Sequence, residues 1–150
     1  LVSRRAREGS GRLRDRMSAE KHRIRREDAS AATDYLRKAA DNHAQMVAAL
    51  QAGNFNAAGT LALQCAISSA DAICVREKGV RSTSQDHRDV CVLVGSITLP
   101  EAGEKAVPLS RIIGRKHAIQ YESRAIRSSE AEEIVKAASR FHQWVLAHVR

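Results

Sequence analysis

The stretch from Asn54 to Gly79 constrains the fold of this chain more than any other. Its apolar side chains leave no broad polar stripe at helical spacing: Ala57, Ala58, Leu61, Ala62, Leu63, Cys65, Ala66, Ile67, Ala70, Ala72, Ile73, Cys74 and Val75. A helix that is apolar on nearly every side needs neighbours on more than one side, and its alanines allow them to approach closely. Asn54 suits the start of this helix and Gly79 its end. We therefore expect a bundle with this helix near its middle.

The rest of the chain also favours helix. Its 150 residues suffice for one domain with a single core, and two prolines and few aromatic residues argue against a large sheet. Apolar periodicity predicts four further helices, at about 28–50, 82–99, 109–126 and 129–149. The sequence therefore predicts an all-α fold, a single five-helix bundle built from up-down antiparallel hairpins, with no strands.

Prolines and glycines set the expected boundaries in the second half of the chain. Pro100 is expected to end the third helix, and residues 101–108 to form a connection with one helical turn at most. Pro108 suits the first turn of the fourth helix, and Gly114 weakens the middle of that helix.

The last predicted helix carries a single apolar stripe. Ser129 and Glu132 have the spacing of a capping box at its start. The stripe consists of Ile134, Ala138, Phe141, Val145 and Val149. Trp144 lies beside it, and a small bundle that leaves this face uncovered would bury it against a second copy of the chain. The pattern therefore favours a homodimer.

The net charge of +8 is unevenly distributed. Residues 1–27 hold ten Lys or Arg against four acids, whereas the remaining residues hold fifteen against thirteen. We interpret 1–27 as a basic, disordered N-terminal arm and 28–150 as the bundle domain. Such an arm can bind phosphates without sequence preference. Alternatively it is a solvated leader translated upstream of a start at Met17, so that residues 1–16 do not belong to the native protein.

Several classes of protein are disfavoured. No apolar run approaches the roughly 20 residues that cross a bilayer, and no secretory signal is evident, so we expect a soluble cytoplasmic protein with no membrane partner. Three cysteines in apolar helical surroundings indicate buried reduced thiols. The six histidines never fall at HxxxH or HExxH spacing, so we expect neither a metal site nor a cofactor.

Asp71 is the one acidic side chain within the apolar helix. Buried carboxylates are usually paired. An ion pair with Arg115, Lys116 or His117 explains its presence at least as well as a catalytic role does.

Three segments of the chain occur in the same order as three segments that one protein family has in common. AALQAGNFNAA is followed by the alanine-spaced LALQCAISSADAICVREKG; SQDHRDVCVLV places His87 at the start of the third helix; and RKHAIQYESRAI has a basic residue followed by Tyr. Over about residues 28–148 the chain resembles the HEPN domains (higher eukaryotes and prokaryotes nucleotide-binding). The resemblance implies a HEPN-like bundle that binds a nucleotide or RNA.

The resemblance also implies candidate catalytic residues. Toxin-like HEPN members cleave RNA without a metal and pair an Arg with a His a few residues later, which Arg111 and His117 match. A guanidinium can hold the scissile phosphate, and an imidazole can exchange a proton near neutral pH. On an ideal helix the two lie on different faces, unless the helix distorts near Gly114 or a dimer mate completes the site. Lys116 aligns with the family's basic residue before Tyr121.

Three functions stay open. The first is nucleotide or RNA binding without robust catalysis, with Arg115, Lys116 and Tyr121 facing a phosphate-bearing ligand. The second is a metal-independent endoribonuclease toxin, with Arg111 or Arg115 and His117 in its site and a nucleotidyltransferase-type antitoxin as partner. The third is a helical dimerisation or partner-binding module, in which His117 and Tyr121 merely stack on each other. The family's clefts between protomers favour a homodimer in each case.

Overall fold

The computed structural model describes residues 24–84 and 88–149. Its helices are, in chain order, α2 (Ala31–Gln51), α3 (Phe55–Lys78), α4 (Arg88–Gly95), α5 (Ala102–Gly114), α6 (Lys116–Tyr121) and α7 (Ser128–His148). Two short strands accompany them, β1 (Ile24–Arg26) and β2 (Val80–Ser82). The protein is a helical bundle, as predicted, in which α5 and α6 together take the place of the fourth predicted helix.

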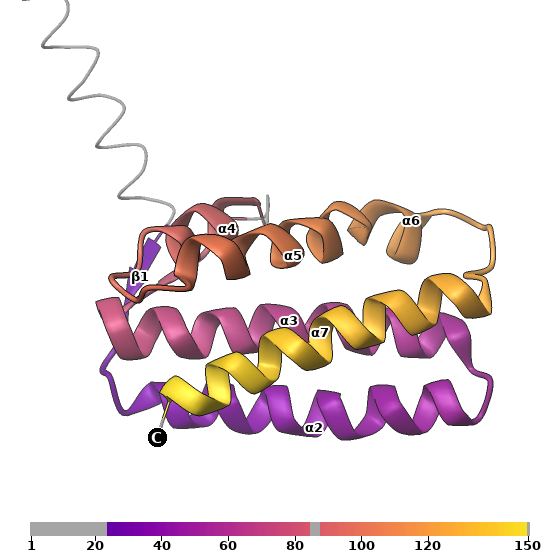
Figure 1. Cartoon of the computed structure of the whole chain (residues 1–150), viewed down its shortest axis with the longest axis horizontal. Coiled ribbons are helices and arrows are strands. Elements are labelled where there is room, and N and C mark those ends of the chain that lie inside the picture. Colours follow the sequence, from indigo (N-terminus) through magenta and orange to yellow (C-terminus); the bar gives the residue numbers. More distant parts are fainter. Residues whose placement is uncertain (1–23, 85–87, 150) are drawn as a thin grey trace, which may run out of the picture.

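Helix α3 lies at the centre of the bundle. It contacts α2 and α7 on one side and α4, α5 and α6 on the other (Figure 1). This arrangement confirms the prediction that the apolar helix has neighbours on more than one side. By length and composition alone α3 could also cross a membrane, but 78% of its apolar window is buried inside the bundle, as in the core helix of a soluble protein.

The first two helices form the expected hairpin. Gly53 has a φ of 77° in the turn between them, a left-handed conformation that favours glycine. Asn54 occupies the N-cap position of α3, as expected, but its side chain makes no capping hydrogen bond. At the other end Gly79 has a φ of 66°, and its N–H donates to the Val75 carbonyl at 2.9 Å.

The two-stranded sheet was not predicted. Strand β1 pairs antiparallel with β2, with Ile24 opposite Ser82. The N–H of Glu27 donates to the Gly79 carbonyl at 2.9 Å and extends the pairing. The prediction of no strands is therefore wrong, and so is the boundary of the basic arm, because residues 24–27 belong to the fold. The error arose because a strand of three residues gives almost no periodic signal.

The boundaries around α4 and α5 also differ from expectation. Helix α4 ends at Gly95 instead of at Pro100, and the expected connection at 101–108 is helical because α5 begins at Ala102. Pro108 therefore lies inside α5, where its missing N–H removes one helical hydrogen bond. Burial of one face of α5 against the bundle, including Leu109, outweighs that loss.

The weak point expected at Gly114 is present. Arg115 forms a turn between α5 and α6, and α6 ends at Tyr121 instead of continuing to Ile126. The N–H of Ile126 donates to the side-chain oxygen of Asn56 on α3 at 2.8 Å. This contact ties the segment before α7 to the start of α3.

Helix α7 begins one residue earlier than its predicted capping box. The carboxylate of Glu130, and not that of Glu132, accepts a hydrogen bond from the N–H of Arg127 at 3.4 Å. The box formed by Ser129 and Glu132 was therefore wrong, because the N-cap lies two residues earlier, at Arg127, with Glu130 at the third helical position. Arg124 pairs with Glu130 at 2.8 Å and adds to this N-terminal cap.

The apolar stripe of α7 faces the core, as predicted. All five of its members are buried: Ile134, Ala138, Phe141, Val145 and Val149. Trp144 is also buried, and its ring lies 5.8 Å from that of Phe141. The expectation that an uncovered Trp144 face drives dimerisation is therefore wrong, and the homodimer rests on the family resemblance alone.

Candidate functional site

The acidic residue of the central helix is paired with a residue from the strand that follows it. Asp71 is buried on α3, and its Oδ2 lies 3.7 Å from Nη2 of Arg81 on β2. The predicted partners Arg115, Lys116 and His117 were wrong. The chain reverses at Gly79, so that Arg81 returns alongside the last turns of α3, and this return depends on the unpredicted sheet.

Burial governs the electrostatics of this pair. It raises the pKa of Asp71 to about 6, and the Arg81 guanidinium only partly offsets that rise. Burial also opposes the charge on Arg81, but the negative side chains around it, above all Asp71, raise its pKa on balance. Arg81 is therefore a permanent cation beside a carboxylate that accepts a proton in mildly acidic solution.

Further contacts hold Arg81 in place. Its Nη1 donates to the hydroxyl of Tyr35 on α2 at 3.1 Å, and that hydroxyl donates to Oε1 of Glu27 at 2.5 Å. The guanidinium also lies over the Tyr35 ring, 5.2 Å from its centroid. Burial, and next the bond to Glu27, raise the pKa of Tyr35. Within the described part of the chain the buried Nε–H of Arg81 has no acceptor.

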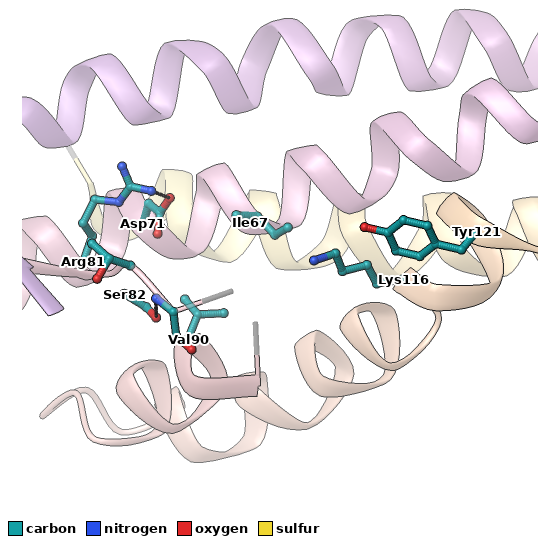
Figure 2. A pocket seen from close by; sticks show the side chains of 9 residues that line it. Ile67, Asp71, Arg81, Ser82, Val90, Lys116 and Tyr121 are labelled. Carbon is teal, nitrogen blue, oxygen red and sulfur yellow. Dashed lines mark hydrogen bonds and ion pairs between the residues drawn. The ribbon is translucent and has the colours of Figure 1, made fainter. Parts of the chain in front are cut away.

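A cleft of about 540 Å³ opens beside this pair. It is lined by Ile67, Asp71, Arg81, Ser82, Thr83, Ser84, Val90, Lys116 and Tyr121. Figure 2 shows the Asp71–Arg81 pair at one end, with the ammonium of Lys116 and the hydroxyl of Tyr121 pointing toward it from the other. The cleft therefore brings α6 together with α3, β2 and the start of α4, three consecutive elements that lie much earlier in the sequence.

Two of the predicted binding residues lie in this cleft and one does not. Lys116 and Tyr121 line it, and Tyr121 is 70% exposed. Arg115 instead pairs with Glu133 of α7, with Nη2 and Oε2 3.2 Å apart. Arg115 and Lys116 are adjacent in the sequence, and adjacent helical residues point about 100° apart, so the two cations face different neighbours.

The predicted catalytic residues lie on different helices. Arg111 is exposed near the end of α5, and His117 is exposed near the start of α6. Neither lines the cleft. The ring centroids of His117 and Tyr121 are 5.5 Å apart with a 42° tilt, which is the stacking that the spacing predicted. His87 lies outside the described residues.

Arg81 is the site residue that the sequence analysis missed. One signal was available, because an acid inside an apolar helix requires a cation, and Arg81 is the first cation beyond the glycine that ends this helix. Ser82, Thr83 and Ser84 were assigned to the start of the third predicted helix and instead line the cleft.

A second polar cluster is buried between α2, α3 and α7. Ser69 Oγ lies 3.1 Å from Nδ1 of His142, and Nε2 of His43 lies 2.8 Å from Oγ of Ser139. The two histidine rings stack 5.0 Å apart at 29°. Burial, and next the proximity of His43, lower the pKa of His142, so its ring stays neutral at pH 7. No local pattern in the sequence indicates this cluster.

The cleft contains two cations and one carboxylate, together with several hydroxyl groups. In the described ranges, 24–84 and 88–149, no three His, Cys, Asp or Glu side chains come together so as to hold a metal ion. Lys116 and Arg81 offer cationic N–H donors, and the serine and threonine side chains offer hydroxyls. Comparisons with protein-family models, with curated proteins and with solved structures give no match to this chain. The HEPN assignment therefore stays a prediction from the sequence pattern.

Proposed function

We propose that this protein is a HEPN-like domain that binds a nucleotide or a short segment of single-stranded RNA in the cleft between Arg81 and Lys116. The buried Nε–H of Arg81, which has no acceptor among the described residues, is the observation that carries the proposal. An orphaned buried donor is costly, and a phosphate oxygen in the cleft would satisfy it.

The other residues of the cleft suit the same ligand. The volume of about 540 Å³ falls in the range of small-molecule sites. Lys116 lies opposite Arg81 and would neutralise a second phosphate oxygen or a neighbouring phosphate (Figure 2). Tyr121 exposes its ring, and exposed aromatic rings are the usual stacking surface for unpaired bases.

The proposal is tested by titrating the full-length protein with a fluorescent single-stranded RNA pool in EDTA at several salt concentrations. Lys116→Ala is expected to weaken binding about tenfold and to reduce the salt dependence by about one phosphate contact. Lys136→Ala removes the same charge from an exposed position on α7 outside the cleft and is expected to bind as the wild type does. Equal binding by all three proteins would contradict the proposal.

RNA cleavage is the second candidate function. The observation in its favour is the helix break at Arg115, because Arg111 and His117 lie on different faces of a continuous helix and need a distortion near Gly114 to share one site. The same samples are therefore also analysed on a denaturing gel. We expect binding without cutting; cutting that His117→Ala abolishes at unchanged helicity would establish the endoribonuclease instead.

A further inference from the structure

A second cleft of about 460 Å³ lies between α2 and α3. It shares Ile67, Asp71 and Arg81 with the first cleft, so the two adjoin along the Asp71–Arg81 pair. A ligand group held at Arg81 is therefore at the entrance to both. A mononucleotide phosphate does not fill this space, whereas a nucleotide chain that crosses Arg81 would enter it.

The second cleft differs from the first in its chemistry. Asn42, Gln64 and Ser68 line it, and each has a neutral side chain that both donates and accepts hydrogen bonds. In the part of the chain that the structure describes, none of these three side chains has a hydrogen-bond partner. Ser68 is only 9% exposed, so its hydroxyl faces a confined space.

Most of the charged and aromatic groups of this cleft already interact with one another. Lys38 and Arg81 lie over the Tyr35 ring, with their charged ends 5.8 and 5.2 Å from its centroid. Asp71 pairs with Arg81. Asp41 is a second carboxylate in the lining, so the cleft contains as many carboxylates as cations. A ligand group in this cleft therefore meets amides and a hydroxyl, with no surplus of either charge.

Hydrogen-bonding amides in a site of balanced charge suit the edge of a nucleobase. We propose that the second cleft recognises the base edge of the nucleotide whose phosphate lies at Arg81, and so gives the protein a base preference. Phosphate contacts position a nucleic acid, and hydrogen bonds to base edges specify it. The inference rests on the proposed function. In it, the first cleft binds the phosphate and the second cleft recognises the base.

The test uses the full chain and four RNA trinucleotides, UAU, UCU, UGU and UUU, which differ only in the central base. The wild type is expected to bind the best of the four about tenfold more tightly than the worst, as hydrogen bonds to a base edge typically give. Gln64→Ala and Asn42→Ala are expected to reduce that ratio to about threefold or less. Gln45→Ala, an exposed amide on α2 outside both clefts, is expected to leave the ratio unchanged.

The outcomes separate this inference from the proposed function. Lys116→Ala is expected to weaken all four trinucleotides by a similar factor and to preserve their ratio. Equal binding of all four by the wild type, with a loss of affinity in Lys116→Ala, would overturn the base cleft and leave the phosphate site standing. Binding that Lys116→Ala does not weaken for any trinucleotide would overturn both.

Discussion

Two of the buried polar side chains on α3, Ser69 and Asp71, have surroundings that are opposite in kind. Ser69 is fully buried and pairs with a neutral histidine of α7, whereas Asp71 pairs with a cation at the edge of two clefts. Two positions along a helix turn the side chain by about 200°, so the two face opposite sides. One side of α3, the sealed side, is covered by α2 and α7 at Ser69, and the other, the open side, adjoins the two clefts at Asp71.

The sealed side shows how a buried polar cluster contributes to stability. His142 is 4% exposed, and its ring lies between the Ser69 hydroxyl and the His43 ring, so that its contacts join α2, α3 and α7. Neutral buried groups that find partners avoid the penalty of an unpaired charge. On the open side Arg81 keeps an unpaired Nε–H, which is a worse arrangement for stability and a better one for binding.

The largest expected effect comes from breaking the sealed side. Ser69→Val leaves Nδ1 of His142 without its partner and adds volume where Ser69 is 0% exposed. We expect the free energy of unfolding to fall by about 3 kcal/mol, as for other orphaned polar groups combined with overpacking. Chemical denaturation monitored by circular dichroism measures the change.

Ser68→Ala is the matched control, because it removes a hydroxyl from the adjacent position on the cleft side. That hydroxyl has no partner among the described residues, so the expected change in stability is about 0.5 kcal/mol or less. Equal losses in the two variants would contradict the distinction between a sealed and an open side.

The second prediction concerns the charge on the open side. The native pKa of Asp71 is about 6 against an ordinary value of 3.8, so the native state binds the proton more tightly than the unfolded chain does. The stability contributed by the protonated carboxyl is fully present below pH 3.8 and is lost as the pH rises through about 6. Asp71→Asn, which cannot ionise, is expected to match the wild type near pH 4 and to exceed its stability by about 2 kcal/mol at pH 7.

The measurement is the difference in unfolding free energy between the two proteins across that pH range. The Ser69 side supplies the contrast, because the lowered pKa of His142 works in the opposite direction, and its contribution is lost as the pH falls. A difference between the wild type and Asp71→Asn that stays constant from pH 4 to 7 would show that Asp71 does not have a raised pKa.

The sequence predicted the architecture better than the site, and the two polar residues of α3 illustrate why. The burial of α3 followed from thirteen apolar side chains at helical spacing, a strong collective signal. The partner of Asp71 depended on a reversal at one glycine and on a strand of three residues, neither of which has a collective signal. The Ser69 contact joins residues 73 positions apart, and nothing in the local pattern of either residue encodes it.

The cleft residues on α6 were predictable in part. Lys116 and Tyr121 were expected to face a ligand, and they do line a cleft. Arg115 was expected beside them, but the helix break that Gly114 favours turns it toward Glu133. Gly114 indicated that the helix was weak near this position. Only the structure shows that Lys116 lines the cleft and that Arg115 pairs with Glu133 instead.

The smallest expected effect compares the two left-handed glycines that flank α3. Gly53 and Gly79 have φ values of 77° and 66°, and an added methyl group meets no close contact at either, since the nearest atom to Gly79 is the Glu27 oxygen at 3.7 Å. Replacing either by Ala is therefore expected to lower the unfolding free energy by about 1 kcal/mol through backbone strain alone.

The two changes are expected to differ in their effect on RNA binding, because only Gly79 leads directly into the strand that carries Arg81. Gly79→Ala is expected to weaken RNA binding about threefold by displacing that guanidinium, and Gly53→Ala is expected to leave it unchanged. Equal binding by the two variants would mean that the turn at Gly79 tolerates the strain without moving Arg81, and that the open side of α3 is held by its contacts to Asp71 and Tyr35 instead of by the reversal of the chain.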